Sequence, residues 1–173
     1  MKKIVYIILV ALVAGFYSCE TDYDAEDQGI TLTDLPKYVA FYVAGAGSTI
    51  ADVDVDAGSD TDDAVNVQIP GGTLSDVTVN YTFSGTAVYG TDYTVDGASS
   101  TGGSVTIEYG TTPNVDGLPF NADIVVEALP GASDSTLTIT LSSASNAEGE
   151  IAVGRGGTDL LKTVNVNITA ATP

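Results

Sequence analysis

Six aspartates lie close together in the stretch ADVDVDAGSDTDDAV, residues 51–65. Carboxylates at this density are the ligands that calcium prefers, so the stretch raises the question of a metal loop. The alternate aspartates of the DVDVD run match the first three ligand positions of an EF-hand loop, but Ala57 stands where that loop needs glycine. Asp63 replaces its long bidentate glutamate, and no helical pattern flanks the stretch. We therefore reject an EF-hand.

The simpler interpretation of these aspartates is an edge strand. Side chains alternate along a strand, so the aspartates of the run project to one side and Val53 and Val55 to the other. Residues 58–63 then turn the chain into a strand that begins near Ala64. A row of like charges is costly unless it is screened, protonated or bridged by a cation, so a weak divalent-cation site is the alternative. Its ligands would be Asp60, Asp62, Asp63 and Asp92.

Few residues of the chain are suited to catalysis. The sequence has no histidine and one cysteine, and it shows no Ser-His-Asp set, no phosphate-binding glycine loop and no His/Cys metal cluster. Two carboxylates can hydrolyse a glycosidic bond, but a large number of carboxylates does not identify such a pair. We predict that the protein is not an enzyme.

The charge of the chain excludes one class of partner. Five Lys and Arg residues stand against 23 Asp and Glu residues, which gives a formal charge of -18. Lys2 and Lys3 lie in the N-terminal leader, so the rest of the chain is more acidic still. A surface of this kind attracts cations and repels nucleic acid.

Residues 1–18 are predicted to be a lipoprotein signal peptide. Two lysines precede the apolar run 4–16, which is too short to span a bilayer as a mature helix. The run ends in FYSC, which resembles the lipobox of bacterial lipoproteins, and Cys19 is the only cysteine. The resemblance implies that Cys19 is acylated and anchors the protein to the membrane.

Residues 19–35 are predicted to form an acidic, flexible tether, because they contain a cluster of acids and no periodic apolar pattern. An acidic stretch directly after the lipidated cysteine is similar to a surface-export signal of Bacteroidota lipoproteins. We therefore expect an exported lipoprotein of the bacterial cell envelope, in the outer membrane and exposed at the surface. In enterobacteria the same stretch would imply inner-membrane retention.

The remaining residues, 36–171, show the period-two alternation of half-buried strands. Glycine-rich and proline-containing turns separate the apolar stripes, and no helical period follows the leader. We predict an all-β fold, an antiparallel immunoglobulin-like β-sandwich of about seven or more strands. The apolar stripes fall at 39–43, 65–69, 77–83, 105–109, 123–129, 137–141 and 164–168.

The segment VTVNYTFSGTAVYGTDYTV, residues 77–95, carries a family resemblance. Its strand, its GTA turn and its GTDY sequence resemble the central signature of Calx-β domains, which are β-sandwiches. From the residues alone, Gly85 and Gly90 permit tight turns, and Asp92 can accept hydrogen bonds from turn N–H groups. A turn cap and a metal ligand are therefore both open interpretations of Asp92.

The Calx-β resemblance also implies where a Ca²⁺ site would lie. Family members bind calcium at one end of the sandwich through clustered acids. Two of the family's acidic runs have become EALP at 127–130 and TAA at 169–171, a loss that should weaken or abolish calcium binding. The matching positions in this sequence are Asp60, Asp62, Asp63, Asp92, Glu127 and Asp134.

These observations favour a lipid-anchored, non-catalytic module for binding, adhesion or structure, with a protein or glycan partner at the cell surface. One alternative is a glycan-binding accessory lipoprotein of a surface uptake system, and another is a calcium-stabilised adhesin. Sugar-binding surfaces usually present aromatic rings, and the sequence has no tryptophan. Tyr89 and Phe120 are the rings that the alternating pattern commits least to a core, so they are the candidate ligand-binding aromatics.

Overall fold

The computed structural model describes residues 37–43, 47–110 and 120–171. Contacts divide the chain into Met1–Leu35 and Pro36–Pro173, and only the second unit contains described residues. No helix among the described residues is long and apolar enough to cross a membrane. The strands are β1 (Tyr38–Phe41), β2 (Val53–Asp56), β3 (Asn66–Gln68), β4 (Val77–Gly85), β5 (Tyr93–Val95), β6 (Gly102–Ile107), β7 (Asn121–Asp123), β8 (Val126–Ala128), β9 (Ser135–Asn146), β10 (Gly149–Val153) and β11 (Thr163–Thr169), with a 3-10 turn at Arg155–Gly157.

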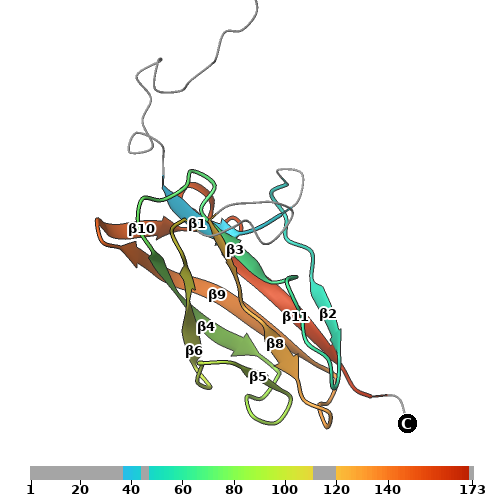
Figure 1. Cartoon of the computed structure of the whole chain (residues 1–173). Helices are drawn as coiled ribbons and strands as arrows, with labels where there is room; N and C mark the ends of the chain where they lie inside the picture. The colour runs from blue at the N-terminus through green and yellow to red at the C-terminus, as the bar shows by residue number, and fades with distance from the viewer. Residues whose placement is uncertain (1–36, 44–46, 111–119, 172–173) are drawn as a thin grey trace, which may run out of the picture. The chain divides into compact units, whose positions relative to one another are not determined.

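The long strand β9 is the centre of one layer. Strand β4 runs antiparallel along one of its sides, and β11 and β10 pair antiparallel with the two halves of the other side. Strand β6 extends this layer beyond β4, and β2 extends it beyond β11. The layer thus has β2 and β6 as its outer strands (Figure 1).

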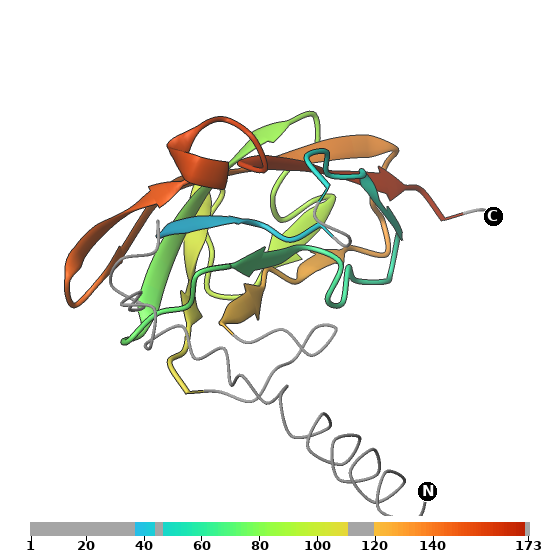
Figure 2. The same cartoon turned by 90° about the horizontal axis from the view of Figure 1, so that it is seen from above.

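A second layer faces the first across the core (Figure 2). It contains the antiparallel strands β1, β3 and β7 and a separate antiparallel pair, β5 and β8. Strand β1 also pairs in parallel with β10, so hydrogen bonding continues from one layer to the other. The two layers together form a sandwich whose loops gather at its ends.

Alternating apolar side chains from both layers fill the core. In β9 the register with β4 skips Ser142, so the buried face passes from Leu141 to Ala144 rather than to Ser143. This bulge explains why the apolar alternation of the sequence ends in LSSA. The least exposed core side chains include Val39, Val67, Val77, Val79, Ile107, Val126, Leu137, Ile139, Leu141 and Val166.

The predicted all-β sandwich is confirmed, and the structure corrects two details. The stripe at 123–129 is not one strand: β7 pairs with β3, and after two residues β8 pairs with β5 in the same layer. The pairing is also not wholly antiparallel, because β2 joins β11 and β1 joins β10 in parallel. A period-two pattern reports which face is buried but not the direction of the neighbouring strand.

Candidate functional site

The carboxylate of Asp92 lies immediately before β5. It stands at the end of the sandwich that holds the β4–β5 and β8–β9 loops, which we call the loop end. It is buried, with 5% of its surface exposed. One oxygen accepts a hydrogen bond from the backbone N–H of Val88 at 2.8 Å, and the other accepts one from the N–H of Ser133 at 3.1 Å. Asp92 therefore closes its own turn and fastens it to the loop between β8 and β9.

The GTA turn, residues 85–87, joins β4 to β9 at the same end. The N–H groups of Thr86 and Ala87 both donate to the carbonyl of Thr136, and the N–H of Thr136 donates back to the Thr86 hydroxyl at 3.0 Å. A Cβ at Gly85, which has φ of 108°, would collide with that same carbonyl. Glycine is thus required where β4 approaches the start of β9.

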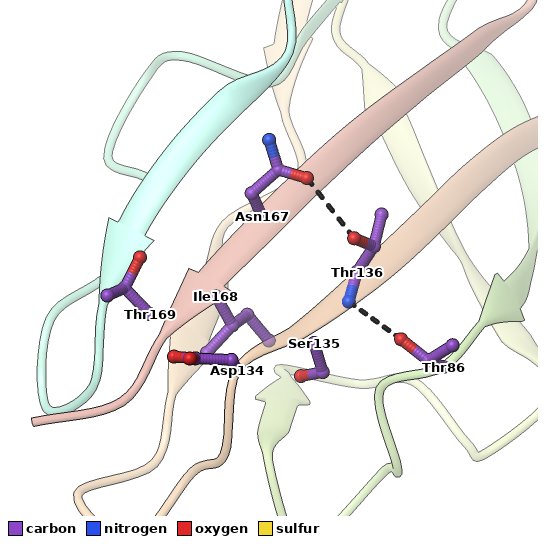
Figure 3. A pocket seen from close by; sticks show the side chains of 7 residues that line it. All are labelled: Thr86, Asp134, Ser135, Thr136, Asn167, Ile168 and Thr169. Carbon is purple, nitrogen blue, oxygen red and sulfur yellow. Dashed lines mark hydrogen bonds between the residues drawn. The ribbon is translucent and has the colours of Figure 1, made fainter.

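Asp134 joins the start of β9 to the end of β11. Its Oδ1 accepts a hydrogen bond from the backbone N–H of Ala170 at 2.8 Å. Beside it lies an open hollow of about 440 Å³ (Figure 3). Within it the Thr136 hydroxyl donates to Asn167 Oδ1 at 3.2 Å. The lining is hydroxyl, amide and carboxylate groups with one apolar side chain: Thr86, Asp134, Ser135, Thr136, Asn167, Ile168 and Thr169.

The acids of the loop between β2 and β3 have other partners. Asp60 Oδ1 accepts a hydrogen bond from the N–H of Asp62 at 2.8 Å, and Asp62 adopts a left-handed conformation with φ of 47°. Asp60 also forms an isolated β-bridge with Glu127. Glu127 Oε2 in turn accepts a hydrogen bond from the Thr94 hydroxyl at 3.1 Å.

Asp62 and Asp63 act electrostatically on a residue that the sequence did not single out, Asp123 in β7. Burial raises the pKa of Asp123 above its usual value. The hydrogen bond from Asn66 opposes that rise, and the charges of Asp63 and Asp62 add to it. Only pairing between β3 and β7 brings this carboxylate near the acidic loop, so no local pattern could have identified it.

The residues that the Calx-β resemblance implies do not fit a calcium site. Both oxygens of Asp92 accept hydrogen bonds from backbone N–H groups. Asp134 and Asp60 each accept one such bond with one oxygen. Among the residues that the structure describes, no three His, Cys, Asp or Glu side chains lie close enough to hold a metal ion. Calcium takes six to eight oxygen ligands, several of them carboxylates, and the described acids at this end do not form such a cluster.

The DVDVD aspartates belong to a hydrogen-bonded polar face. The edge strand and its alternation are confirmed, with Val55 buried and its neighbours Asp54 and Asp56 exposed. The parallel pairing with β11 places an asparagine amide opposite each of two aspartates: Asn165 donates to Asp52 at 3.1 Å, and Asn167 donates to Asp54 at 3.0 Å. Two of the aspartates thus accept hydrogen bonds from neutral amide groups of β11.

The two candidate ligand-binding rings pack more closely against the core than their sequence pattern indicates. The Tyr89 ring lies 5.5 Å from Tyr93 and 6.4 Å from Phe83, and its hydroxyl donates to the carbonyl of Ala98 at 2.9 Å. Phe120 also packs against the core. Both rings are thus half-buried against the core, whereas Tyr81 and Tyr93 are fully buried in it. The ring of Tyr109, expected in a strand stripe, is instead 54% exposed.

The buried tyrosines are poor acid–base groups. Burial, and to a lesser degree the neighbouring Tyr89, raises the pKa of Tyr93 to about 12. The same two causes raise the pKa of Tyr81. Both phenols stay protonated at physiological pH and serve as packing groups.

Cys19, the predicted lipidation site, lies outside the described residues, as do the predicted signal peptide and the tether. Residues 111–119, which precede Phe120, also lie outside them.

Comparisons with known proteins bear on the fold alone. No protein-family model matches the sequence, and no similar sequence is found among curated proteins. The crystal structure of the apo-form Calx CBD1 domain aligns with a TM-score of 0.50 at 16% identity, covering 80% of this chain and 100% of that domain. The crystal structure of the Calx CBD2 domain aligns with a TM-score of 0.47 at 14% identity, covering 78% and 87% of the two chains. The chain is thus similar in fold to a Calx-β sandwich.

Proposed function

We propose that this chain is a non-catalytic binding module of a bacterial cell envelope, anchored by lipid on Cys19 and displayed at the outer surface. The observation that carries the proposal is the open hollow at the loop end, where hydroxyl, amide and carboxylate side chains converge. The lipobox-like FYSC sequence and the acidic segment after it support the anchor.

The hollow fits a hydroxyl-rich ligand better than an anionic one. Its hydroxyl and amide groups both donate and accept hydrogen bonds, and its one carboxylate accepts them. The formal charge of -18 disfavours anionic partners over the whole surface. A neutral glycan or a polar protein segment therefore suits this lining.

Membrane anchoring is tested first with a Cys19→Ala variant. Cells that express the wild-type chain should yield the protein in the detergent phase after temperature-induced phase separation, whereas the variant should remain in the aqueous phase. Protease added to intact cells should remove the wild-type protein if the domain faces outward. A variant that still enters the detergent phase would overturn the anchor.

Glycan capture is a second candidate function, and the polar lining of the hollow favours it. The purified protein should bind a subset of neutral glycans on an array, and Asp134→Ala with Asn167→Ala should abolish that binding. Asn80→Ala is the matched control, because Asn80 lies on β4 of the same layer but does not line the hollow, and its amide donates to the Ser143 hydroxyl. Binding that the double variant retains would exclude the hollow as the sugar site.

The third function, a calcium-stabilised adhesin, receives no support from the loop end. Asp92 and Asp134 instead hold that end together through hydrogen bonds from backbone N–H groups.

A further inference from the structure

A groove of about 270 Å³ lies beside β6 and shares no lining residue with the hollow of Figure 3. Its lining contains one serine and two aspartates, and the other side chains are apolar or aromatic. Those side chains are Tyr81, Val95, Val105, Ile124 and Val125. The groove thus has a larger share of apolar side chains than the hollow, which has one.

Val125 is an apolar residue at an outward-facing position between β7 and β8. Its neighbours Ile124 and Val126 are 2% and 0% exposed, whereas Val125 is 43% exposed. A single exposed valine is common on protein surfaces, but this one lines the same groove as Val95 and Val105. An apolar side chain of a ligand would remove this surface from water.

Strand β6 borders the groove through Ser104 and Val105 and pairs only with β4 in the described part of the chain. The N–H of Phe83 donates to the carbonyl of Thr101 at 3.1 Å. Because hydrogen-bonded pairs alternate along antiparallel strands, Val105 bonds to Val79, and the backbone groups of Ser104 point away from β4. An extended segment can therefore add to β6 at Ser104. The residues next to the one that bonds there would direct their side chains to the face of Val105, where the groove lies.

Charge determines which segment suits the groove. Asp96 lines it and is exposed, and the whole chain has a formal charge of -18. The other carboxylate of the lining, Asp123, already accepts a hydrogen bond from Asn66 at 2.6 Å, so the cationic contact is assigned to Asp96 alone. Lysine and arginine suit such a place, because their stems can cover apolar surface while the charged head reaches a carboxylate.

We propose that this groove binds an extended basic segment of a partner protein. The segment adds to β6 at Ser104, packs an apolar side chain on Val105 and Val125, and places an arginine or lysine beside Asp96. Backbone pairing supplies affinity, and the groove supplies the preference for those side chains. The site depends neither on the membrane anchor nor on the hollow at the loop end.

The probe is the synthetic peptide acetyl-Thr-Val-Thr-Arg-Thr-amide, whose valine and arginine share one face when the peptide is extended. It is titrated at low salt into the full-length protein, labelled with nitrogen-15 and purified in detergent. The amide signals of Ser104, Val105 and Val125 should shift and saturate in the millimolar range. The same peptide with glutamine in place of arginine should bind about threefold more weakly, and this difference should disappear at high salt.

Two variants test the two halves of the groove, and each has a matched control. Asp96→Asn should weaken binding of the arginine peptide by about threefold and leave the glutamine peptide unchanged. Asp159→Asn removes the same charge from a fully exposed residue outside the groove and should have no effect. Val125→Ser should weaken binding of both peptides by about fivefold. Val88→Ser, at a valine that is 55% exposed and does not line the groove, should change neither.

Both test variants change exposed side chains, and an otherwise unchanged amide spectrum verifies that each is folded. Equal weakening by Asp96→Asn and Asp159→Asn, with shifts spread over the acidic surface, would overturn the proposal in favour of general charge attraction. An absence of shifts at Val105 and Val125 at millimolar peptide would also overturn it.

Discussion

Asp92 accepts a hydrogen bond from the backbone N–H of Ser133, and this contact joins two loops that are 41 residues apart in the sequence. The same carboxylate accepts the N–H of Val88 with its other oxygen. One buried side chain thus holds the turn before β5 against the turn before β9.

Replacing Asp92 by asparagine should destabilise the fold by about 2–4 kcal/mol, because an amide NH₂ would face one of the two N–H donors and leave it unsatisfied. Urea unfolding at pH 7 in EDTA measures the change, and calcium should not restore the loss. Asp159→Asn is the matched control, since Asp159 is fully exposed and its pairing with Lys162 should leave stability unaltered within error. Equal urea midpoints for Asp92→Asn and the wild type would contradict the role given to Asp92.

The asparagines of β11 should matter because they face aspartates. Asn167→Asp would oppose Asp54 with a like charge and remove the donor that now binds it. We expect a loss of about 1 kcal/mol at low salt that shrinks at 0.5 M sodium chloride. Asn80→Asp, opposite Ser104 and Ser143, should show no such salt dependence. Identical salt responses in the two variants would refute the arrangement.

Gly103 should resist substitution for lack of space, not for its backbone angle. A Cβ there would lie 2.7 Å from the hydroxyl of Tyr81 and 2.8 Å from Cβ of Ala98. Gly103→Ala should therefore cost about 1–3 kcal/mol. Gly131→Ala, where a Cβ meets nothing within 4 Å, should be neutral or slightly stabilising. Thermal unfolding of both variants checks the contrast, which equal melting temperatures would exclude.

Asp123 should give stability a particular pH dependence. Its folded pKa lies above the usual value of 3.8, so the folded state holds more protons than the unfolded state between the two pKa values. The free energy of unfolding should fall as pH rises through that window, and Asp123→Asn should lack this fall. Urea midpoints of both proteins between pH 3 and 7, measured in EDTA, test the difference. Parallel curves would show that the pKa of Asp123 is not raised.

Much of the sandwich could be predicted from the sequence because each strand has one apolar face. The alternation of Val53 and Val55 with aspartates located an edge strand, and the segment 77–95 indicated the fold. The sequence did not indicate which strands pair with each other. The parallel pairing of β2 with β11, which gives the aspartates their asparagine donors, depends on how distant strands assemble.

The candidate site was harder to predict for the same reason. Asp92 was open to two roles until its donors at Val88 and Ser133 were known. The hydrogen bond from Asn66 to Asp123 belongs to no local motif, since the two residues are 57 positions apart. A sequence pattern can show that a residue is polar, but its burial and its hydrogen-bond partners appear only in the folded chain.

The intact mass of the mature protein, purified from its native membranes, tests the proposed anchored module most directly. The account predicts a chain that begins at Cys19 and carries the added mass of acyl chains on that residue. A protein that retains residues 1–18, or that begins at an unmodified Cys19, would contradict it.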